Sequence, residues 1–411
     1  MFEIPILYEW LAFAVRWVHV ITAIAWIGSS FYFIALDLGL NRSGDFGGAD
    51  GEEWQVHGGG FYHVRKYLVA PEAMPEHLTW FKWESYSTWL SGFALLMVVY
   101  WMGGELFLID ANKSNLLLWQ GILLSAAVLT IGWVVYDFLC KSPLAKHPTV
   151  LMVLLFCLLV VMGYGLNQVF TGRAMMLHLG AFTATIMTAN VFFIIMPNQR
   201  VVVADLQAGR VPDAKYGKIA KLRSTHNNYL TLPVIFLMLS NHYPLAFATQ
   251  YNWIIAALVF LMGVTIRHFF NSMHAKKGMQ WWTWCVTAIL FILIMWLSSA
   301  GPVVKPLEEA ELDMPAAGVQ FAEAEGFQQV SDIVLGRCSM CHAREPSWDG
   351  IHRAPKGILL ETQGEIAVNA QAIYVHAGVT DAMPPANVSW MEPDERAAIV
   401  AWFKAAGRTP G

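Results

Sequence analysis

Long apolar runs recur through the first 300 residues, and they constrain the fold more than any other feature. A helix needs about 20 apolar residues to cross a hydrocarbon core roughly 30 Å thick. Of the 411 residues, 56% are hydrophobic and only 14% are charged, against about 25% charged in an average soluble domain. The sequence therefore predicts an all-α, eight-helix transmembrane bundle over residues 1–300. The predicted spans are roughly 8–38, 86–107, 116–139, 149–170, 174–196, 226–242, 250–270 and 281–300.

Basic residues between these spans predict the orientation of the bundle. Lys and Arg gather in the loops after the first, third, fifth and seventh spans, whereas the alternate loops contain only Lys113 and Arg173. Cytoplasmic loops carry the excess of positive charge, so both termini are predicted to lie outside the cytoplasm. The net charge of −4 and the lack of a basic patch argue against nucleic acid as a partner.

A Cys-x-x-Cys-His motif near the C-terminus consists of Cys338, Cys341 and His342. This spacing is typical of c-type haem, whose vinyl groups bond to the two thiols while the imidazole ligates the iron. A zinc site is the weaker alternative, because two further ligands would be needed nearby. The motif therefore predicts haem c as a cofactor and electron transfer as part of the function.

The surroundings of the motif predict a complete electron-transfer domain. Met383 stands before two prolines and is the expected second iron ligand, and the Pro355 carbonyl is expected to bind the ring of His342. Residues 325–411 are thus predicted to form a class I-like cytochrome c domain, and residues 301–324 an acidic tether. Bacteria attach haem c in the periplasm, so a multi-pass protein of the bacterial inner membrane with a periplasmic C-terminal domain is expected.

Ionisable residues inside membrane spans are costly and are functional candidates for that reason. One group lies near the predicted cytoplasmic ends of four spans, where it is expected to form a pocket for a planar, hydrogen-bonding ligand. Interfacial snorkelling and helix capping are the alternative for each member. The group consists of Glu84, Asp137, His226, Asn227, Asn228, Arg267, His268 and Asn271.

His19 and His178 lie in the opposite halves of their spans, toward the predicted outer face. Each is either a packed histidine bonded to a neighbouring helix or an iron ligand of a b-type haem. An electron from the cytoplasmic side would have to cross about 30 Å of hydrocarbon, so a haem b relay would be useful.

Two further features of residues 1–300 allow hypotheses. Aligning Gly132 with Gly263 also aligns Asp137 with His268, which suggests a 4+4 repeat of the spans. Residues 41–85 are rich in Gly and aromatic side chains and are expected to cover the pocket or to anchor the chain at the membrane surface.

The eight spans, the tether, the Cys-x-x-Cys-His domain and the run from Ser224 to Pro233 (Ser-Thr-His-Asn-Asn-Tyr-Leu-Thr-Leu-Pro) together resemble one family. It is that of the bacterial membrane-bound urate hydroxylases, also called cytochrome-c urate oxidases, and the resemblance covers nearly the whole chain. It implies oxidation of urate to 5-hydroxyisourate without peroxide. Electrons would pass through haem c to a periplasmic cytochrome c or a terminal oxidase.

Urate is a flat anion edged with donors and acceptors, and this chemistry suggests roles for the polar group. His226 or Glu84 is the expected base, Asn227 orients urate or the attacking water, and Arg267 holds the anion. The remaining expected substrate-binding residues are Asn228, Asp137 and His268. A quinol or other small-molecule dehydrogenase, and a transporter or haem-bearing anchor in the membrane lipid, are the alternatives.

Overall fold

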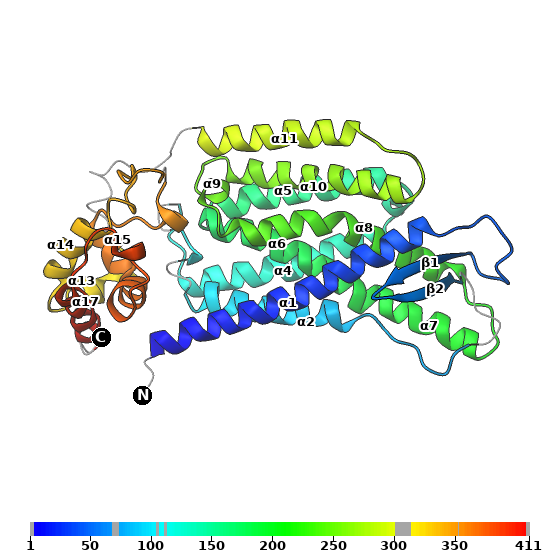
Figure 1. Cartoon of the computed structure of the whole chain (residues 1–411), viewed down its shortest axis with the longest axis horizontal. Helices are drawn as coiled ribbons and strands as arrows, with labels where there is room; N and C mark the ends of the chain where they lie inside the picture. Colours follow the sequence, from blue (N-terminus) through cyan, green and yellow to red (C-terminus); the bar gives the residue numbers. More distant parts are fainter. Residues whose placement is uncertain are drawn as a thin grey trace.

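The computed structural model describes residues 4–67, 74–103, 107–110, 113–300, 314–351 and 353–407. Long helices form an elongated bundle, with a small helical domain at one end and a two-stranded hairpin at the other (Figure 1). We call these the C-terminal-domain end and the hairpin end. The bundle contains α1 (Ile4–Gly39), α2 (Trp83–Leu96) continued by the π-helix η1 (Met97–Trp101), α4 (Leu118–Lys141), η2 (Pro143–Lys146), α5 (Pro148–Asn167), α6 (Gly172–Ala189), the π-helix η3 (Asn190–Ile195), α7 (Met196–Gln207), α8 (Ala214–Ser240), α9 (Pro244–Phe247), α10 (Asn252–His274) and α11 (Trp282–Ser299).

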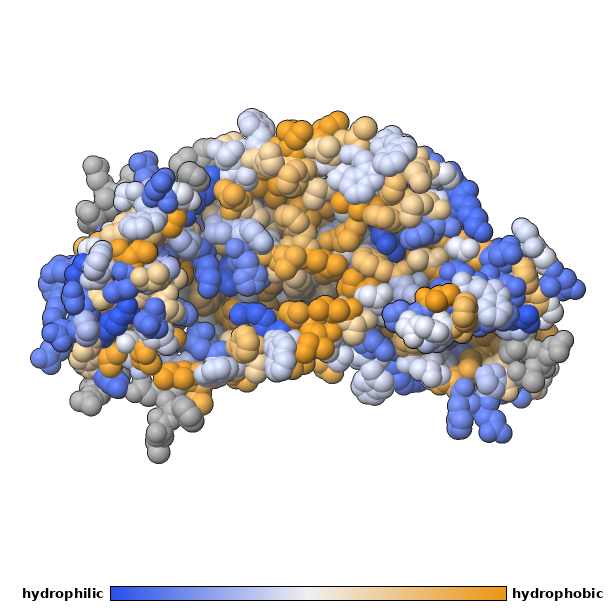
Figure 2. All heavy atoms as spheres, in the orientation of Figure 1, coloured by the Kyte–Doolittle hydropathy of each residue, from blue (hydrophilic) through white to orange (hydrophobic). Residues whose placement is uncertain are grey.

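Six described helical segments are long and apolar enough to cross a membrane, namely α1, α4, α5, the continuous run Gly172–Gln207, α10 and α11. The other two predicted spans are also helices of the bundle, α2 with η1 and the whole of α8. Figure 2 shows a hydrophobic band across the middle of the molecule and hydrophilic surfaces at both ends. The structure therefore supports a membrane protein, while the count of eight spans stays a prediction.

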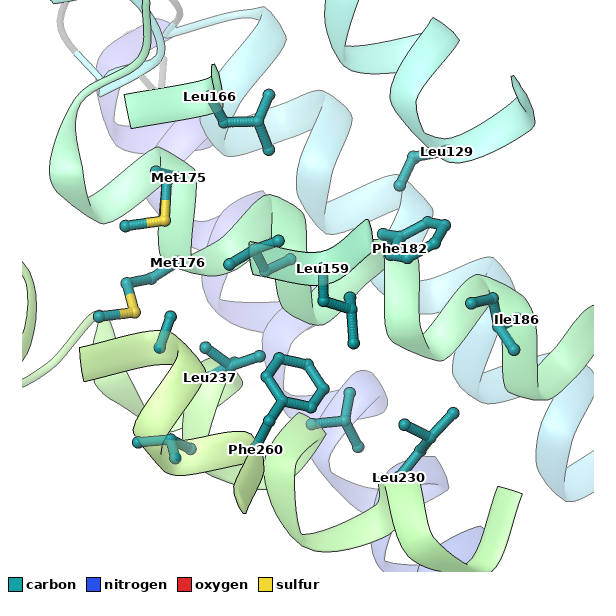
Figure 3. Packing of buried hydrophobic residues seen from close by; sticks show 14 of the residues in the cluster. Leu129, Leu159, Leu166, Met175, Met176, Phe182, Ile186, Leu230, Leu237 and Phe260 are labelled. Atoms are coloured by element: carbon teal, nitrogen blue, oxygen red, sulfur yellow. The ribbon is translucent and has the colours of Figure 1, made fainter. Parts of the chain in front are cut away.

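The core of the bundle is built mainly from α4, α5, α6, α8 and α10 (Figure 3). Close approach of these helices depends on two glycines. A Cβ on Gly132 would lie 2.4 Å from the Phe182 ring, and one on Gly263 would lie 2.5 Å from the Pro233 ring. Both glycines of the proposed repeat are thus helix contact points, although the repeat itself stays a prediction.

Residues 51–66 depart from the all-α prediction, because they form an antiparallel hairpin of β1 (Gly51–His57) and β2 (Gly60–Lys66). Gly58 and Gly59 both have positive φ, 58° and 81°, as the mirror-image turns that suit hairpins require. Trp54 stacks on His63 across the strands at 4.2 Å. The alternating side chains and the Gly-Gly turn thus favour a hairpin here, although the rest of the chain is helical.

The C-terminal domain has its own core, which contains Phe327, Val330, Val334, Ile399 and Trp402. Its elements are α13 (Ala316–Ala322), α14 (Phe327–Arg337), η4 (Pro355–Gly357), α15 (Gln363–Val368), α16 (Ala370–Ile373), the π-helix η5 (Tyr374–Val379), η6 (Pro385–Asn387) and α17 (Pro393–Ala406).

The domain starts before the predicted boundary at residue 325. The Trp402 indole donates a 2.8 Å hydrogen bond to the Phe321 carbonyl, and the two rings are in contact. Because α13 is held in this way, the last part of the predicted tether belongs to the domain. The rest of the tether, residues 301–313, lies outside the described residues.

Arg353 connects the C-terminal domain to the bundle. Its guanidinium donates to the carbonyl of Ala248 at 2.8 Å and to that of Ser298 at 2.6 Å. Ser298 lies in the last turn of α11, where the carbonyls lack helical partners and attract positive charge. The domain is therefore docked on the end of the bundle where α11 ends.

Candidate functional site

Three consecutive polar residues on α8, His226 to Asn228, lie buried in the hairpin-end half of the bundle. Successive helical residues are separated by about 100°, because a turn holds 3.6 residues. His226 and Asn227 accordingly contact α4, α6 and η3, whereas Asn228 contacts α10. The polar group predicted as one pocket is thus divided by α8 into two clusters.

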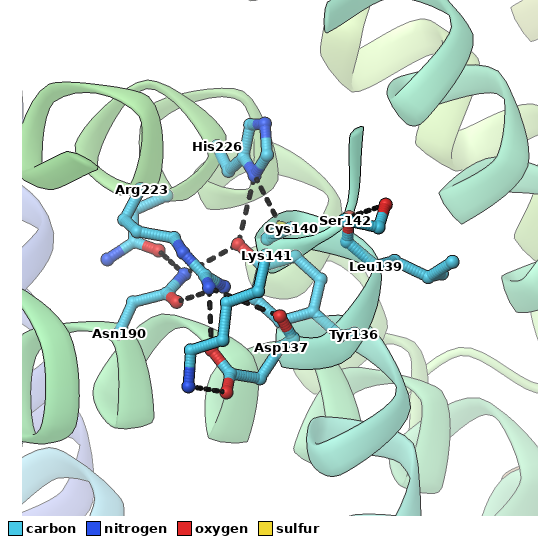
Figure 4. A network of polar contacts seen from close by, with 10 residues as sticks. Tyr136, Asp137, Leu139, Cys140, Lys141, Ser142, Asn190, Arg223 and His226 are labelled. Carbon is cyan, nitrogen blue, oxygen red and sulfur yellow. Dashed lines mark hydrogen bonds and ion pairs between the residues drawn. The ribbon is translucent and has the colours of Figure 1, made fainter. Parts of the chain in front are cut away.

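The first cluster, which we call the Arg223 network, begins at a buried ion pair (Figure 4). Arg223 is only 2% exposed and donates to Asp137 at 2.5 Å and to the amide oxygen of Asn190 at 3.2 Å. Lys141 pairs with the same carboxylate at 2.6 Å and is largely exposed. Asp137 thus neutralises a buried arginine, and its role in substrate binding stays a prediction.

The Arg223 network continues from Asn190 to His226. The Asn190 amide nitrogen donates to the Tyr136 hydroxyl at 2.8 Å and to the Asn227 oxygen at 2.9 Å. That hydroxyl lies 2.9 Å from Nδ1 of His226, and the Asn227 amide nitrogen donates to the carbonyl of Met187 at 2.9 Å. Asn227 therefore uses both ends of its amide within the protein.

The second cluster, the Arg267 cluster, lies on the α10 side of α8. Arg267 Nε donates to the Asn228 side-chain oxygen at 2.6 Å, and the Asn271 amide nitrogen donates to the same oxygen at 3.2 Å. The guanidinium lies over the ring of Phe31 on α1, at 4.3 Å. Arg267 and Asn228 are 5% and 3% exposed, so the charge is held in a fixed position away from bulk water.

Two buried polar atoms of the Arg267 cluster, Arg267 Nη2 and Asn271 Oδ1, have no hydrogen-bond partner among the described residues, and the same holds for Glu84 Oε2 on α2. A buried unsatisfied group costs about 1–3 kcal/mol, and more when it is charged. Such atoms in a folded protein call for an explanation, and a missing ligand is one. A ligand offering an acceptor to Arg267 and a donor to Asn271 would satisfy both.

The packing of α1 on α2 indicates the depth of Glu84. His19 on α1 contacts Thr88 of α2, four residues after Glu84, and Phe33 contacts Phe81, just before α2 begins. Since the helices run antiparallel, Glu84 lies between the levels of His19 and Phe33 on α1. Glu84 and Arg267 are thus on two helices that both pack against α1.

The other predicted site residues have partners of their own. His268 pairs with the Tyr229 hydroxyl at 3.2 Å. His178 is fully buried, and both of its ring nitrogens are engaged at 2.7 Å, by Ser125 and by the carbonyl of Ala174.

His19 contacts α2 through Nδ1, which lies 3.1 Å from the carbonyl of Thr88 and 3.2 Å from the Ser91 hydroxyl. The environment of His178 therefore favours the packed-histidine alternative, because an iron ligand needs a free ring nitrogen. For His19, ligation of a b-type haem stays a prediction.

The Cys-x-x-Cys-His motif begins at the end of α14, with Cys338 as the C-cap residue. His342 Nδ1 lies 3.0 Å from the carbonyl of Ile358, so the expected bond to Pro355 is wrong and η4 places a later carbonyl at the ring. This bond leaves Nε2 free for a metal, as in other ligating histidines. Burial lowers the pKa of His342, partly opposed by that bond, and so favours the neutral ligating form.

The remaining motif residues are also compatible with haem c. Cys338 and Cys341 are free thiols, and burial raises the pKa of Cys338 to about 12. Met383 is half-buried against the same apolar core as Cys338. Within the described residues, no group of three or more His, Cys, Asp or Glu side chains is placed to hold a metal ion, which gives no support to the zinc alternative.

Sequence reasoning missed four residues of these clusters: Phe31, Tyr136, Asn190 and Arg223. Asn190 was detectable as an amide inside an apolar span, and Arg223 as a basic residue one turn before His226. Tyr136 and Phe31 carry no such signal, since aromatic residues are common throughout the bundle.

Comparison with known families identifies one match. Residues 5–298 match the family model described as urate oxidase N-terminal. The match covers the bundle to the end of α11 and leaves the C-terminal domain outside. No curated protein and no solved structure matches the chain.

Proposed function

The chain belongs to the urate oxidase N-terminal family, and from this premise we propose that it is a membrane urate hydroxylase whose substrate binds at the Arg267 cluster. The family indicates an oxidoreductase acting on urate, and the apolar helices indicate a membrane protein. The proposal adds the site, the reaction and the route of the electrons.

The observation that carries the proposal is the set of unpaired atoms on Arg267, Asn271 and Glu84. Urate is planar and anionic, and along its edges carbonyl oxygens alternate with N–H groups. A urate oxygen can accept from Arg267 Nη2 while a neighbouring N–H donates to Asn271 Oδ1. Charge-assisted hydrogen bonds of this kind are among the strongest in proteins. The Phe31 ring packs against the guanidinium and helps to position it.

The reaction converts urate and one water into 5-hydroxyisourate, with release of two protons and two electrons. A base must remove a proton as the ring is oxidised and water adds at C5. Glu84 is the better candidate, because its buried Oε2 has no other partner. His226 is the weaker one, since its ring lies across α8 from Arg267, bonded to Tyr136.

The electrons leave through the C-terminal domain in this proposal. Cys338 and Cys341 would hold haem c covalently, and His342 and Met383 would bind its iron. When bound, this group accepts one electron at a time. Docking by Arg353 keeps the domain at the end of the bundle, and a periplasmic cytochrome c or a terminal oxidase would be the next acceptor.

The arrangement in the membrane follows from the same proposal. Eight helices cross a bacterial inner membrane, with the hairpin end in the cytoplasm and the C-terminal domain in the periplasm. The Arg267 cluster then lies on the cytoplasmic side, and electrons must cross most of the hydrocarbon core. His19 remains the candidate ligand of a relaying haem b.

The test compares the full-length protein with Arg267→Met under anaerobic conditions. Radiolabelled urate binding and urate-dependent reduction of the haem spectrum are both measured, with Arg210→Met as the control because Arg210 forms only a surface pair with Asp205. Losing a charge-assisted bond is expected to weaken urate binding about 10–100-fold, whereas the control should bind normally. Unchanged urate affinity in Arg267→Met would show that the site lies elsewhere.

A further inference from the structure

An apolar cavity of about 250 Å³ lies between α4, α5, α6, α8 and α10. Two of its lining residues, Val153 and Leu261, are 56% and 37% exposed on the outside of the bundle. The cavity therefore borders the surface that faces lipid in a membrane. Its inner wall includes Leu159, Phe182, Leu230 and Phe260 (Figure 3).

His226 contributes the unpaired polar atom of this cavity. The side chain is 3% exposed, and Nε2 is buried without a hydrogen-bond partner. Figure 4 shows that the ring nitrogen bonded to Tyr136 faces the Arg223 network and that the other nitrogen points away from it. His226 also lines the cavity, so Nε2 is the polar atom offered to a ligand there.

The Arg223 network determines which His226 nitrogen carries the proton. Arginine has only donors, so the Asn190 oxygen must face Arg223 and the Asn190 nitrogen must face Tyr136. The Tyr136 oxygen then accepts from Asn190, and the hydroxyl proton is directed to Nδ1 of His226. In the neutral ring the remaining proton sits on Nε2, and the cavity therefore presents a single N–H donor.

These properties select the class of ligand. It must be apolar, must reach the cavity from the lipid and must carry an acceptor for one buried N–H. Urate does not fit, because this apolar wall would leave its charge and most of its polar atoms unsatisfied. A porphyrin is too large, since pockets for whole drug-sized molecules measure roughly 300–1,000 Å³. An acyl chain would leave the His226 donor unpaired.

We infer that this cavity binds the ring of a lipid-soluble quinone, whose carbonyl oxygen accepts a hydrogen bond from His226 Nε2. The flat ring lies among leucine and phenylalanine side chains, and the isoprenoid tail leaves between Val153 and Leu261. His226 lines this site, whereas Arg267, Asn228 and Asn271 do not. It is a second ligand site, beyond the proposed urate site and independent of it.

The experiment measures thermal unfolding of the full-length protein in lipid nanodiscs with increasing decylubiquinone. A ligand that binds only the folded state raises Tm in a concentration-dependent way. Dodecylbenzene, which has a ring and a tail but no carbonyl, is the probe without an acceptor. The variants are His226→Phe, Val153→Trp to fill the opening, and Val161→Trp as the matched control at a lipid-exposed valine of the same helix.

Decylubiquinone is expected to raise the Tm of the wild type and of Val161→Trp equally. Dodecylbenzene is expected to raise the Tm of both proteins less than decylubiquinone does. His226→Phe should weaken quinone binding about tenfold, as loss of one hydrogen bond predicts, and Val153→Trp should abolish it. Equal effects of the two probes, or full quinone binding in both variants, would overturn the inference. The inference would also be overturned if urate raised the Tm of the wild type and Val153→Trp removed this effect. Normal urate binding in Arg267→Met, by contrast, would overturn only the proposed urate site.

Discussion

The two faces of α8 pack against similar polar residues, but these residues differ in how completely they are hydrogen-bonded. On one face, Arg223 donates to an aspartate and to Asn190, and Asn190 in turn donates to a tyrosine and a second asparagine. Among the described residues of this network, His226 Nε2 has no partner. On the other face, the Arg267 cluster bonds an arginine to one asparagine oxygen and leaves a guanidinium nitrogen and an amide oxygen without a partner among the described residues. The Arg223 network is satisfied almost entirely within the protein, whereas the Arg267 cluster is where we propose that the ligand binds.

Arg223→Met should have the largest effect on stability. It leaves Asp137 buried with Lys141 as its remaining charged partner, and breaking a buried ion pair costs about 3–5 kcal/mol. SDS-titrated unfolding of the purified protein measures this loss. Arg210→Met, which removes a surface pair, should cost less than about 1 kcal/mol. Equal stability of the two variants would contradict a structural role for the network.

Glu84→Gln tests the proposed urate site, and the quantity measured is the reaction rate instead of the stability. Removing a general base is expected to lower kcat by about 100-fold or more, while KM changes little because Gln keeps the size and polarity of the side chain. Urate-dependent anaerobic reduction of the protein gives the rate. Glu53→Gln in the hairpin is the control, since that side chain bonds only to Gln55. A raised KM with normal kcat would instead make Glu84 a binding residue.

Asn271→Leu should separate ligand binding from folding within the Arg267 cluster. The amide oxygen has no partner among the described residues, and the amide nitrogen makes one 3.2 Å bond to Asn228, so the substitution is expected to cost about 1 kcal/mol of stability. Urate should bind about tenfold more weakly, because one of its N–H groups loses an acceptor. A large loss of stability with normal urate affinity would place Asn271 with the structural residues.

Tyr136→Phe should have the smallest effect on urate binding, because it changes the Arg223 network alone. Loss of the hydroxyl removes its hydrogen bonds with His226 and Asn190 and is expected to cost about 1–3 kcal/mol, measured by the same SDS titration. Urate affinity should stay normal, since Tyr136 lies across α8 from Arg267. Quinone should raise Tm by less than in the wild type, because the His226 ring is no longer held in one tautomer. Weaker urate binding would mean that the two faces are coupled.

Much of the fold could be predicted from local patterns. The apolar runs predicted helices wherever the structure has long bundle helices, including α8, whose polar residues face other helices instead of lipid. The β1–β2 hairpin was missed because its alternation of polar and apolar residues is short and lies in an aromatic segment beside a predicted span. The start of the C-terminal domain was missed because the Phe321 contact with Trp402 joins residues about 80 positions apart.

Patterns along the chain predict the helices and the residues with distinctive chemistry. Apolar length predicts membrane helices, and the Cys338–His342 spacing predicts a haem attachment motif, because both depend on neighbours in sequence. Which polar residues contact one another depends on the packing of distant helices. His226, Asn227 and Asn228 are adjacent in sequence, yet a rotation of about 100° per residue and the packing of α4, α6 and α10 around α8 assign them to two separate hydrogen-bonded clusters.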